Sequence, residues 1–145
     1  MKKIIVTGSL AYDHLMTFDG EFSQSLIPEK LANLSVSFLA GSHVHGFGGC
    51  AGNIAYSLRL LGCEPLLLGV AGADFGLYSR WLKKNKISTR NIFIDKTKNT
   101  ASAYVLSDNK QNQIAIFSPG AMENRSGGMK LAGGFAGIAC AIIAP

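Results

Sequence analysis

The sequence is short of charge, of cysteine and of long apolar runs. Only 16% of its 145 residues are charged and 48% are hydrophobic, which excludes a disordered chain and favours one domain with a substantial core. Its three cysteines form no Cys-x-x-Cys pair, so they indicate a reducing, cytoplasmic location rather than a disulfide scaffold. The apolar stretches at 4–6 and 131–145 are too short to span a bilayer. We therefore expect a soluble protein without a membrane partner.

Two further classes of ligand lack support. The net charge of +5 is spread along the chain, and the densest basic cluster, 83–86, follows an amphipathic run without interleaved aromatic residues. This pattern predicts a solvated helix end, so we expect no nucleic-acid partner. His43 and His45 are spaced as two ligands on one strand face, but no neighbouring residues supply the third and fourth ligands of a zinc site. We expect no metal site in this chain.

Strand-like and helix-like runs alternate along the sequence. The β-branched run 3–7 predicts a central strand buried on both faces, and the apolar runs 66–70 and 92–94 predict two more. Apolar residues at helical spacing over 51–61 predict a helix that Gly62 closes as its C′ residue. Strand, helix, strand, helix, strand is the order of a parallel α/β sheet.

Asp74 begins the second of these helices. We expect its side chain to cap the helix N-terminus, with Leu77, Trp81 and Leu82 on the inner face. The run 138–144 predicts a last, buried strand.

Two segments interrupt the alternation. Residues 14–45 contain short β-like runs that include 34–39, with a short helix near 28–34, and they predict strands outside the main sheet. The runs 101–106 and 113–117 flank a turn-forming stretch and predict a β-hairpin.

The most informative stretch is Gly48-Gly49-Cys50-Ala51-Gly52-Asn53. A glycine pair lets a ligand approach the backbone closely, and an amide on the first turn of the next helix both donates to and accepts from a hydroxyl. This combination suits a polyhydroxylated ligand such as a sugar or nucleoside. A tight structural turn is the competing interpretation. Residues 46–51 also match Gly-x-Gly-x-x-Ala, a weak dinucleotide-binding fingerprint that should directly follow the first strand and here does not.

The glycine pattern resembles a known signature. Gly48-Gly49, Ala51, Asn53, Ala55, Gly62 and Gly72 fall in register with the N-terminal signature of the ribokinase-like, or phosphofructokinase-B type, sugar and nucleoside kinases. The runs 8–13, 73–76 and 119–121 agree with that family, and the resemblance extends to about Met122. Within the family, residues 47–56 look most like bacterial adenosine kinases.

The resemblance implies a fold and a substrate site. The expected fold is a Rossmann-like parallel α/β sheet flanked by helices, with a small β-sheet lid formed by residues 14–45 and 100–118. Residues 1–145 would be the N-terminal part of this ribokinase-like domain. The family's acceptor contacts map onto Asp13, whose carboxylate would accept hydrogen bonds from ribose hydroxyls, and onto Gly48, Gly49 and Asn53, with Ser9 and Ala11 shaping the floor. Phe38 and Leu39 are candidates to pack against a purine. Some family members also form homodimers through the lid.

The chain departs from the family in what it lacks. The family's Asn-x-x-Glu motif, its nucleotide pocket and its Gly-Ala-Gly-Asp stretch, which carries the catalytic Asp, have no counterpart here. The sites of ATP and Mg²⁺ are therefore expected in a missing C-terminal half. We expect the N-terminal, acceptor-binding half of a kinase, truncated and without phosphoryl transfer of its own.

Several alternatives stay open. The acceptor could be adenosine, another nucleoside or a simple sugar. A non-catalytic fragment that binds ligand or dimerises through the lid is the second hypothesis, and a dinucleotide-binding oxidoreductase is the third. The sequence alone suggests no role for the glycine-rich segment 123–137 and does not decide whether Pro145 is the natural end.

Overall fold

The computed structural model describes residues 2–124, 131, 132, 134 and 136–145. The glycine-rich segment 123–137 therefore lies largely outside the described residues. The elements in chain order are β1 (Lys3–Thr7), β2 (Ala11–Phe18), α1 (Phe22–Ser25), the 3-10 helix η1 (Pro28–Asn33), β3 (Ala40–Gly48), α2 (Cys50–Leu60), β4 (Glu64–Gly72), α3 (Gly76–Lys84), β5 (Ile92–Asp95), β6 (Ala101–Ser107), β7 (Gln113–Ser118), the 3-10 helix η2 (Gly120–Glu123) and β8 (Ile138–Ile143).

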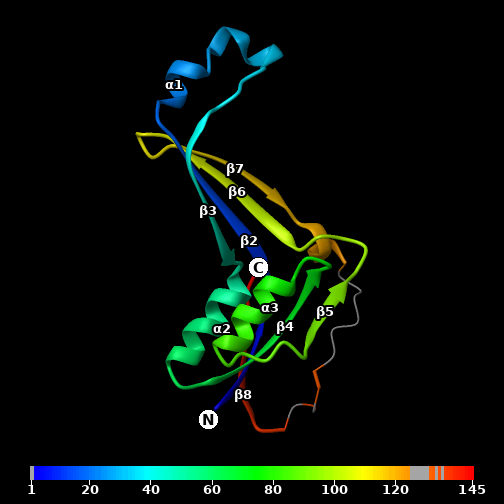
Figure 1. Cartoon of the computed structure of the whole chain (residues 1–145). Helices are drawn as coiled ribbons and strands as arrows, with labels where there is room; N and C mark the ends of the chain where they lie inside the picture. Colours follow the sequence, from blue (N-terminus) through cyan, green and yellow to red (C-terminus); the bar gives the residue numbers. More distant parts are fainter. Residues whose placement is uncertain (1, 125–130, 133, 135) are drawn as a thin grey trace.

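The first sheet is parallel and has the strand order β5-β4-β1-β8. The expected central strand is β1, in which Ile5 pairs with Leu66 on one side and Ala141 on the other. Helices α2 and α3 pack on the same face of this sheet (Figure 1). Their buried side chains meet Val6 and Leu67 in one core cluster. The parallel α/β architecture is thus confirmed, with periodic apolar runs forming the elements that the sequence predicts.

Helix α2 ends at the expected glycine. Gly62 has φ +77°, a backbone conformation that favours glycine. Its N–H donates to the carbonyl of Arg59 at 3.1 Å, and the N–H of Cys63 donates to the carbonyl of Leu58 at 3.0 Å. This is the hydrogen-bond pair of a Schellman C-cap, so the chain reverses here into β4.

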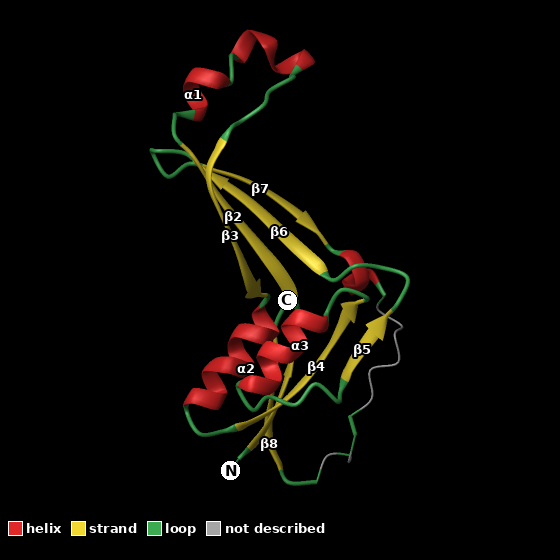
Figure 2. Ribbon diagram, in the orientation of Figure 1, coloured by secondary structure: helices red, strands yellow, loops and turns green. Residues whose placement is uncertain are grey.

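The second sheet has the order β3-β2-β6-β7 and projects away from the first (Figure 2). Strand β2 is antiparallel to β3 and parallel to β6, and the expected hairpin β6–β7 completes the sheet. Its strands extend beyond the segment 14–45 at both ends, since β2 begins at Ala11 and β3 ends at Gly48. The apolar run 34–39 is not a strand: none of the described strands pairs with it, and β3 starts only at Ala40.

The last strand differs from expectation in its burial. Strand β8 forms, but most of its residues are exposed, including Cys140 and Ala141, and Ile143 is 82% exposed. The reason is its position at the edge of the described sheet, where β1 is its single strand neighbour.

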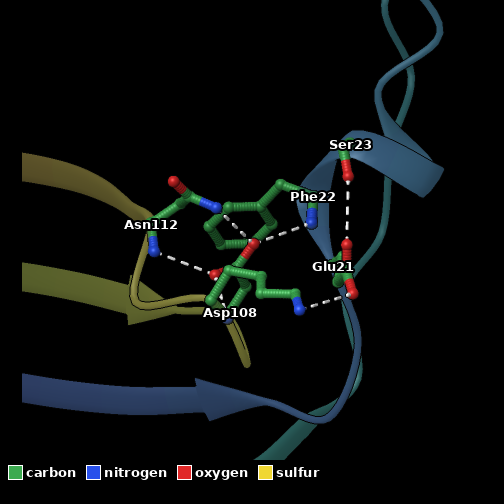
Figure 3. Close-up of polar contacts among 6 residues, drawn as sticks. Glu21, Phe22, Ser23, Asp108 and Asn112 are labelled. Carbon is green, nitrogen blue, oxygen red and sulfur yellow. Dashed lines mark hydrogen bonds and ion pairs between the residues drawn. The ribbon is translucent and has the colours of Figure 1, made fainter.

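Asp108 fastens the hairpin turn to helix α1, far from the first sheet (Figure 3). Its Oδ2 accepts hydrogen bonds from the Phe22 backbone N–H and the Asn112 amide, both at 3.0 Å. Its Oδ1 accepts from the backbone N–H groups of Lys110 and Asn112. Burial alone would raise the pKa of Asp108, but these hydrogen bonds favour the carboxylate and lower the pKa from 3.8 to about 2.

The Asp108 contacts predict a specific response to acid. Because the folded pKa lies below the unfolded one, the stabilisation is present above pH 3.8 and is lost as the pH falls toward about 2. The amide proton shift of Phe22, followed by NMR from pH 5 downward, should therefore titrate with a midpoint near 2. Asp108→Asn should abolish the transition, and a wild-type midpoint near 4 would contradict the assignment.

Candidate functional site

Asp13 lies on a face of the second sheet that is built from small residues. It sits in β2, opposite Gly46 of β3 and Ala103 of β6. Because strand residues alternate between faces, three further small residues lie on the same face at this end of the strands. These are Ala11, Gly48 and Ala101. The five residues around this carboxylate are thus all glycine or alanine.

Gly48 is required by the position of Asp13. A Cβ atom at residue 48 would collide with the Oδ2 of Asp13, whereas one at Gly46 would meet nothing within 4 Å. The carboxylate thus lies directly over the Gly48 backbone. This explains the first glycine of the pair in terms of a charged group held on an open face.

Tyr78 of α3 holds the end of β3 at Gly48. Its hydroxyl donates a hydrogen bond to the carbonyl of Gly48 at 2.8 Å. Burial, with the nearby Asp13 carboxylate, raises the pKa of Tyr78 well above its ordinary value of 10, so the hydroxyl stays protonated as the donor. A Cβ atom at Gly52 would collide with this hydroxyl, which accounts for that glycine. The sequence analysis missed Tyr78, because its partner lies 30 residues away.

Ser9 and Gly49 shape the N-terminus of α2. The Ser9 Oγ accepts from the Cys50 N–H at 2.8 Å, and the Ser9 carbonyl accepts from the Ala51 N–H at 3.0 Å. Gly49 has φ +86°, and a Cβ atom there would lie 2.5 Å from the Ser9 carbonyl oxygen. Ser9 therefore satisfies two of the helix's free N–H donors, and the second glycine allows the backbones to touch.

Asn53 lies on the first turn of α2 with its side chain exposed. Its backbone N–H donates to the Gly49 carbonyl at 3.1 Å. No hydrogen bond joins its side-chain amide to any other residue that the structure describes. The amide is free to bind a ligand near the Gly48-Gly49 turn.

Asp74 does not cap α3. The helix begins at Gly76, and its N-cap residue is Phe75, which makes no side-chain hydrogen bond to the helix. The Asp74 Oδ1 instead accepts from the Thr100 N–H at 2.7 Å and from the Thr100 hydroxyl at 2.6 Å. The Asp74 carboxylate thus binds Thr100, which is distant in the sequence, instead of the N-terminus of α3. Leu77 is also misplaced in the sequence interpretation: it is 55% exposed, and Tyr78 and Leu82 form the buried face.

The opposite face of the second sheet carries rings. The imidazole of His14 stacks on Tyr104, with ring centroids 4.5 Å apart, and on His45, at 4.7 Å. Burial, together with His45 and His43, lowers the pKa of His14. A cavity of about 300 Å³ adjoins these rings, between the sheet and the start of α3. In the described part of the chain no group of three or more His, Cys, Asp or Glu side chains could hold a metal ion.

The two candidates for packing against a purine lie just before β3, near the end of β2 that is remote from Asp13. Phe38 packs edge-on against Phe18 and Phe22, with ring centroids 5.0 and 5.1 Å away, near helix α1. Leu39 is 88% exposed and contributes to no core. The strand register places other apolar side chains on the face of Asp13. These are Leu15, Val44, Val105 and Phe117.

The glycine run 46–51 does not form a dinucleotide site. It spans the end of β3, in the second, mixed sheet, and the start of α2, whereas the oxidoreductase fingerprint requires it to follow β1 of the parallel sheet. None of the described helices is long and apolar enough to cross a membrane. The three cysteines are free thiols.

Solved structures of nucleoside kinases resemble this chain. The nucleoside kinase of Burkholderia thailandensis, solved in complex with inosine, is 38% identical with a TM-score of 0.68, over 82% of this chain and 37% of that one. The nucleoside kinase of Methanocaldococcus jannaschii, an archaeal member of the ribokinase family, has a TM-score of 0.70 at 28% identity, over 83% of this chain and 38% of that one. Both likenesses agree with a ribokinase-like α/β fold of which this chain spans a part.

Sequence comparison also gives nucleoside kinases. The Methanocaldococcus jannaschii nucleoside kinase is 29% identical over 126 residues, which are 86% of this chain and 38% of that protein. The chain thus spans well under half the length of the relatives it matches. The profile of the pfkB family carbohydrate kinases matches residues 1–131. The chain belongs to this pfkB family of carbohydrate kinases.

Proposed function

We propose that this chain forms the acceptor-binding part of an ATP-dependent nucleoside kinase, with adenosine as the acceptor. The observation that carries the proposal is the Asp13 carboxylate, held over Gly48 on a face of small residues. A carboxylate that accepts from two adjacent hydroxyls of a ribose makes charge-assisted hydrogen bonds, which are stronger than neutral ones. The relative from Burkholderia thailandensis, which was solved with inosine, supports a nucleoside over a simple sugar.

The surroundings of Asp13 suit the two parts of a nucleoside. Gly48, Gly49 and Asn53 lie on the side of the first sheet, where the ribose would meet backbone and amide groups. Ala11 and the turn at Ser9 form the floor of this site. The apolar side chains farther out on the same face would contact the base. They are Leu15, Val44 and Phe117, which are 49%, 58% and 53% exposed.

Phosphoryl transfer needs groups that the described residues do not offer. We propose that ATP and Mg²⁺ bind to a further part of the kinase, and that this chain alone does not transfer phosphate to the ribose 5′-hydroxyl. Its own residues would bind and orient the acceptor. The three free thiols favour the cytoplasm as its location.

A homodimer through the second sheet is a second candidate role. Strand β7 is an edge of that sheet, and Ile116 and Phe117 on it are 65% and 53% exposed. An open edge with exposed apolar side chains invites pairing with another strand. Sedimentation equilibrium should show a dimer that Ile116→Lys weakens, and a monomer at every concentration would contradict this role.

Asp13→Asn tests the acceptor site. Loss of the charge should weaken adenosine binding about 10–100-fold in isothermal titration calorimetry, since a hydrogen bond to a charged group contributes about 1.5–3 kcal/mol. By the same reasoning 2′,3′-dideoxyadenosine should bind wild type poorly. Asp19→Asn, an exposed carboxylate beyond the other end of β2, is the matched control and should not change the affinity. Absence of binding by adenosine, inosine and ribose alike would overturn the proposal.

Gly48→Ala tests the position of the carboxylate. The added Cβ meets the free end of the Asp13 side chain, so that side chain should yield while the backbone stays. We expect a shifted ¹³C carboxyl resonance for Asp13 and affinity for adenosine lowered by about tenfold, the effect of a misplaced group. Gly46→Ala lies on the same face in open space and should leave the resonance unchanged. Equal shifts in the two variants would count against the close approach.

A further inference from the structure

The two sheets meet at a joint made by Asp74 and Thr100. Thr100 immediately precedes β6 of the second sheet, and Asp74 follows β4 of the first. The Asp74 Oδ1 accepts both the Thr100 N–H and the Thr100 hydroxyl. The same hydroxyl oxygen accepts the Gly72 N–H at 3.0 Å. One threonine thus links a strand end of each sheet.

The joint is closely packed. Thr100 is 2% exposed, so its hydroxyl and the Gly72 N–H are satisfied within the protein. A Cβ atom at Gly72 or at Gly120 would collide with the backbone of Asn99. Two backbone hydrogen bonds flank the contact, from Ala73 to Lys98 at 2.9 Å and from Ala121 to Asn99 at 2.8 Å.

The loop of Asp74 also holds the strand that carries Asp13. The Tyr12 hydroxyl donates to the Asp74 backbone carbonyl at 2.9 Å. Tyr12 is the neighbour of Asp13 in β2, and β2 pairs along its length with β6, which starts beside Thr100. The joint therefore contacts β2 and β6, two of the three strands around the Asp13 carboxylate.

We propose that Asp74 and Thr100 are positioning residues, which set the orientation of the second sheet and so place Asp13 relative to Asn53 on α2. The segments 8–10 and 96–100 connect the two sheets and form neither helix nor strand. The angle between the sheets must therefore be fixed by hydrogen bonds. The inference about ligand binding rests on the proposed nucleoside site. The inference about orientation stands on the joint alone.

Thr100→Val and Thr100→Ser separate the hydroxyl from the side-chain volume. Valine keeps the shape and the backbone N–H bond to Asp74 but removes the two hydroxyl bonds, to Asp74 and from the Gly72 N–H, whereas serine keeps the hydroxyl. Residual dipolar couplings of the 145-residue chain should fit one alignment tensor for both sheets in wild type and in Thr100→Ser. In Thr100→Val the second sheet should need its own tensor. If one alignment tensor still fits both sheets in Thr100→Val, the proposal that this joint fixes their relative orientation is wrong.

Affinity supplies the second measurement. Adenosine binding should weaken about tenfold in Thr100→Val and stay within about twofold of wild type in Thr100→Ser, because misplacing one binding group lowers affinity without removing it. Unchanged affinity in Thr100→Val would overturn the positioning role. If wild type binds no nucleoside, the proposed function fails, while the dipolar couplings still decide on the joint.

Two variants complete the design. Lys98→Gln removes an exposed ion pair with Glu123 from the same loop but keeps the Lys98 carbonyl as acceptor, so it should change neither measurement. Asp74→Asn keeps an acceptor oxygen without its charge, and it should give an intermediate loss of about threefold in affinity. It also serves as the test if Thr100→Val does not fold, and wild-type couplings and affinity in Asp74→Asn would then overturn the proposal.

Discussion

The close backbone approach at Gly48 and Gly49 is the constraint on which the rest of the site depends. Here β3 of the second sheet ends and α2, which packs on the first sheet, begins, so this one turn connects the two sheets. Gly48 gives room to the Asp13 carboxylate, and Gly49 gives room to the Ser9 backbone. Tyr78 then fixes the turn through the Gly48 carbonyl. A side chain at either glycine would displace the Asp13 carboxylate or the backbone of Ser9 and Ala11.

The second sheet has two different faces. One carries small residues and a single carboxylate near the first sheet, and the other carries stacked rings next to α3. Hydrogen bonds from Tyr12 and Thr100 attach the sheet to the loop that follows β4. The open face is thereby left clear for a ligand, because the attachment uses the opposite side and the strand ends.

Local patterns in the sequence were sufficient for the elements of the parallel sheet and for the glycine cap of α2. These local patterns gave wrong predictions where a residue distant in the sequence determines the structure. An aspartate before a helix is typical of an N-cap, but Thr100, 26 residues away, takes the Asp74 carboxylate. The run 34–39 has strand composition, but no strand in the described part of the chain pairs with it. The register of β2 with β3, which puts Gly48 beneath Asp13, has no signal in either segment taken alone.

The contact between Asp13 and Gly48 has an evolutionary consequence. The two positions lie on different strands, yet one residue's carboxylate occupies the space of the other's missing Cβ. A mutation that adds a side chain at position 48 removes the room for the acid, and loss of the acid removes the requirement for glycine. The two positions are therefore expected to change together among related sequences, whereas Gly46, with open space around it, varies independently of them.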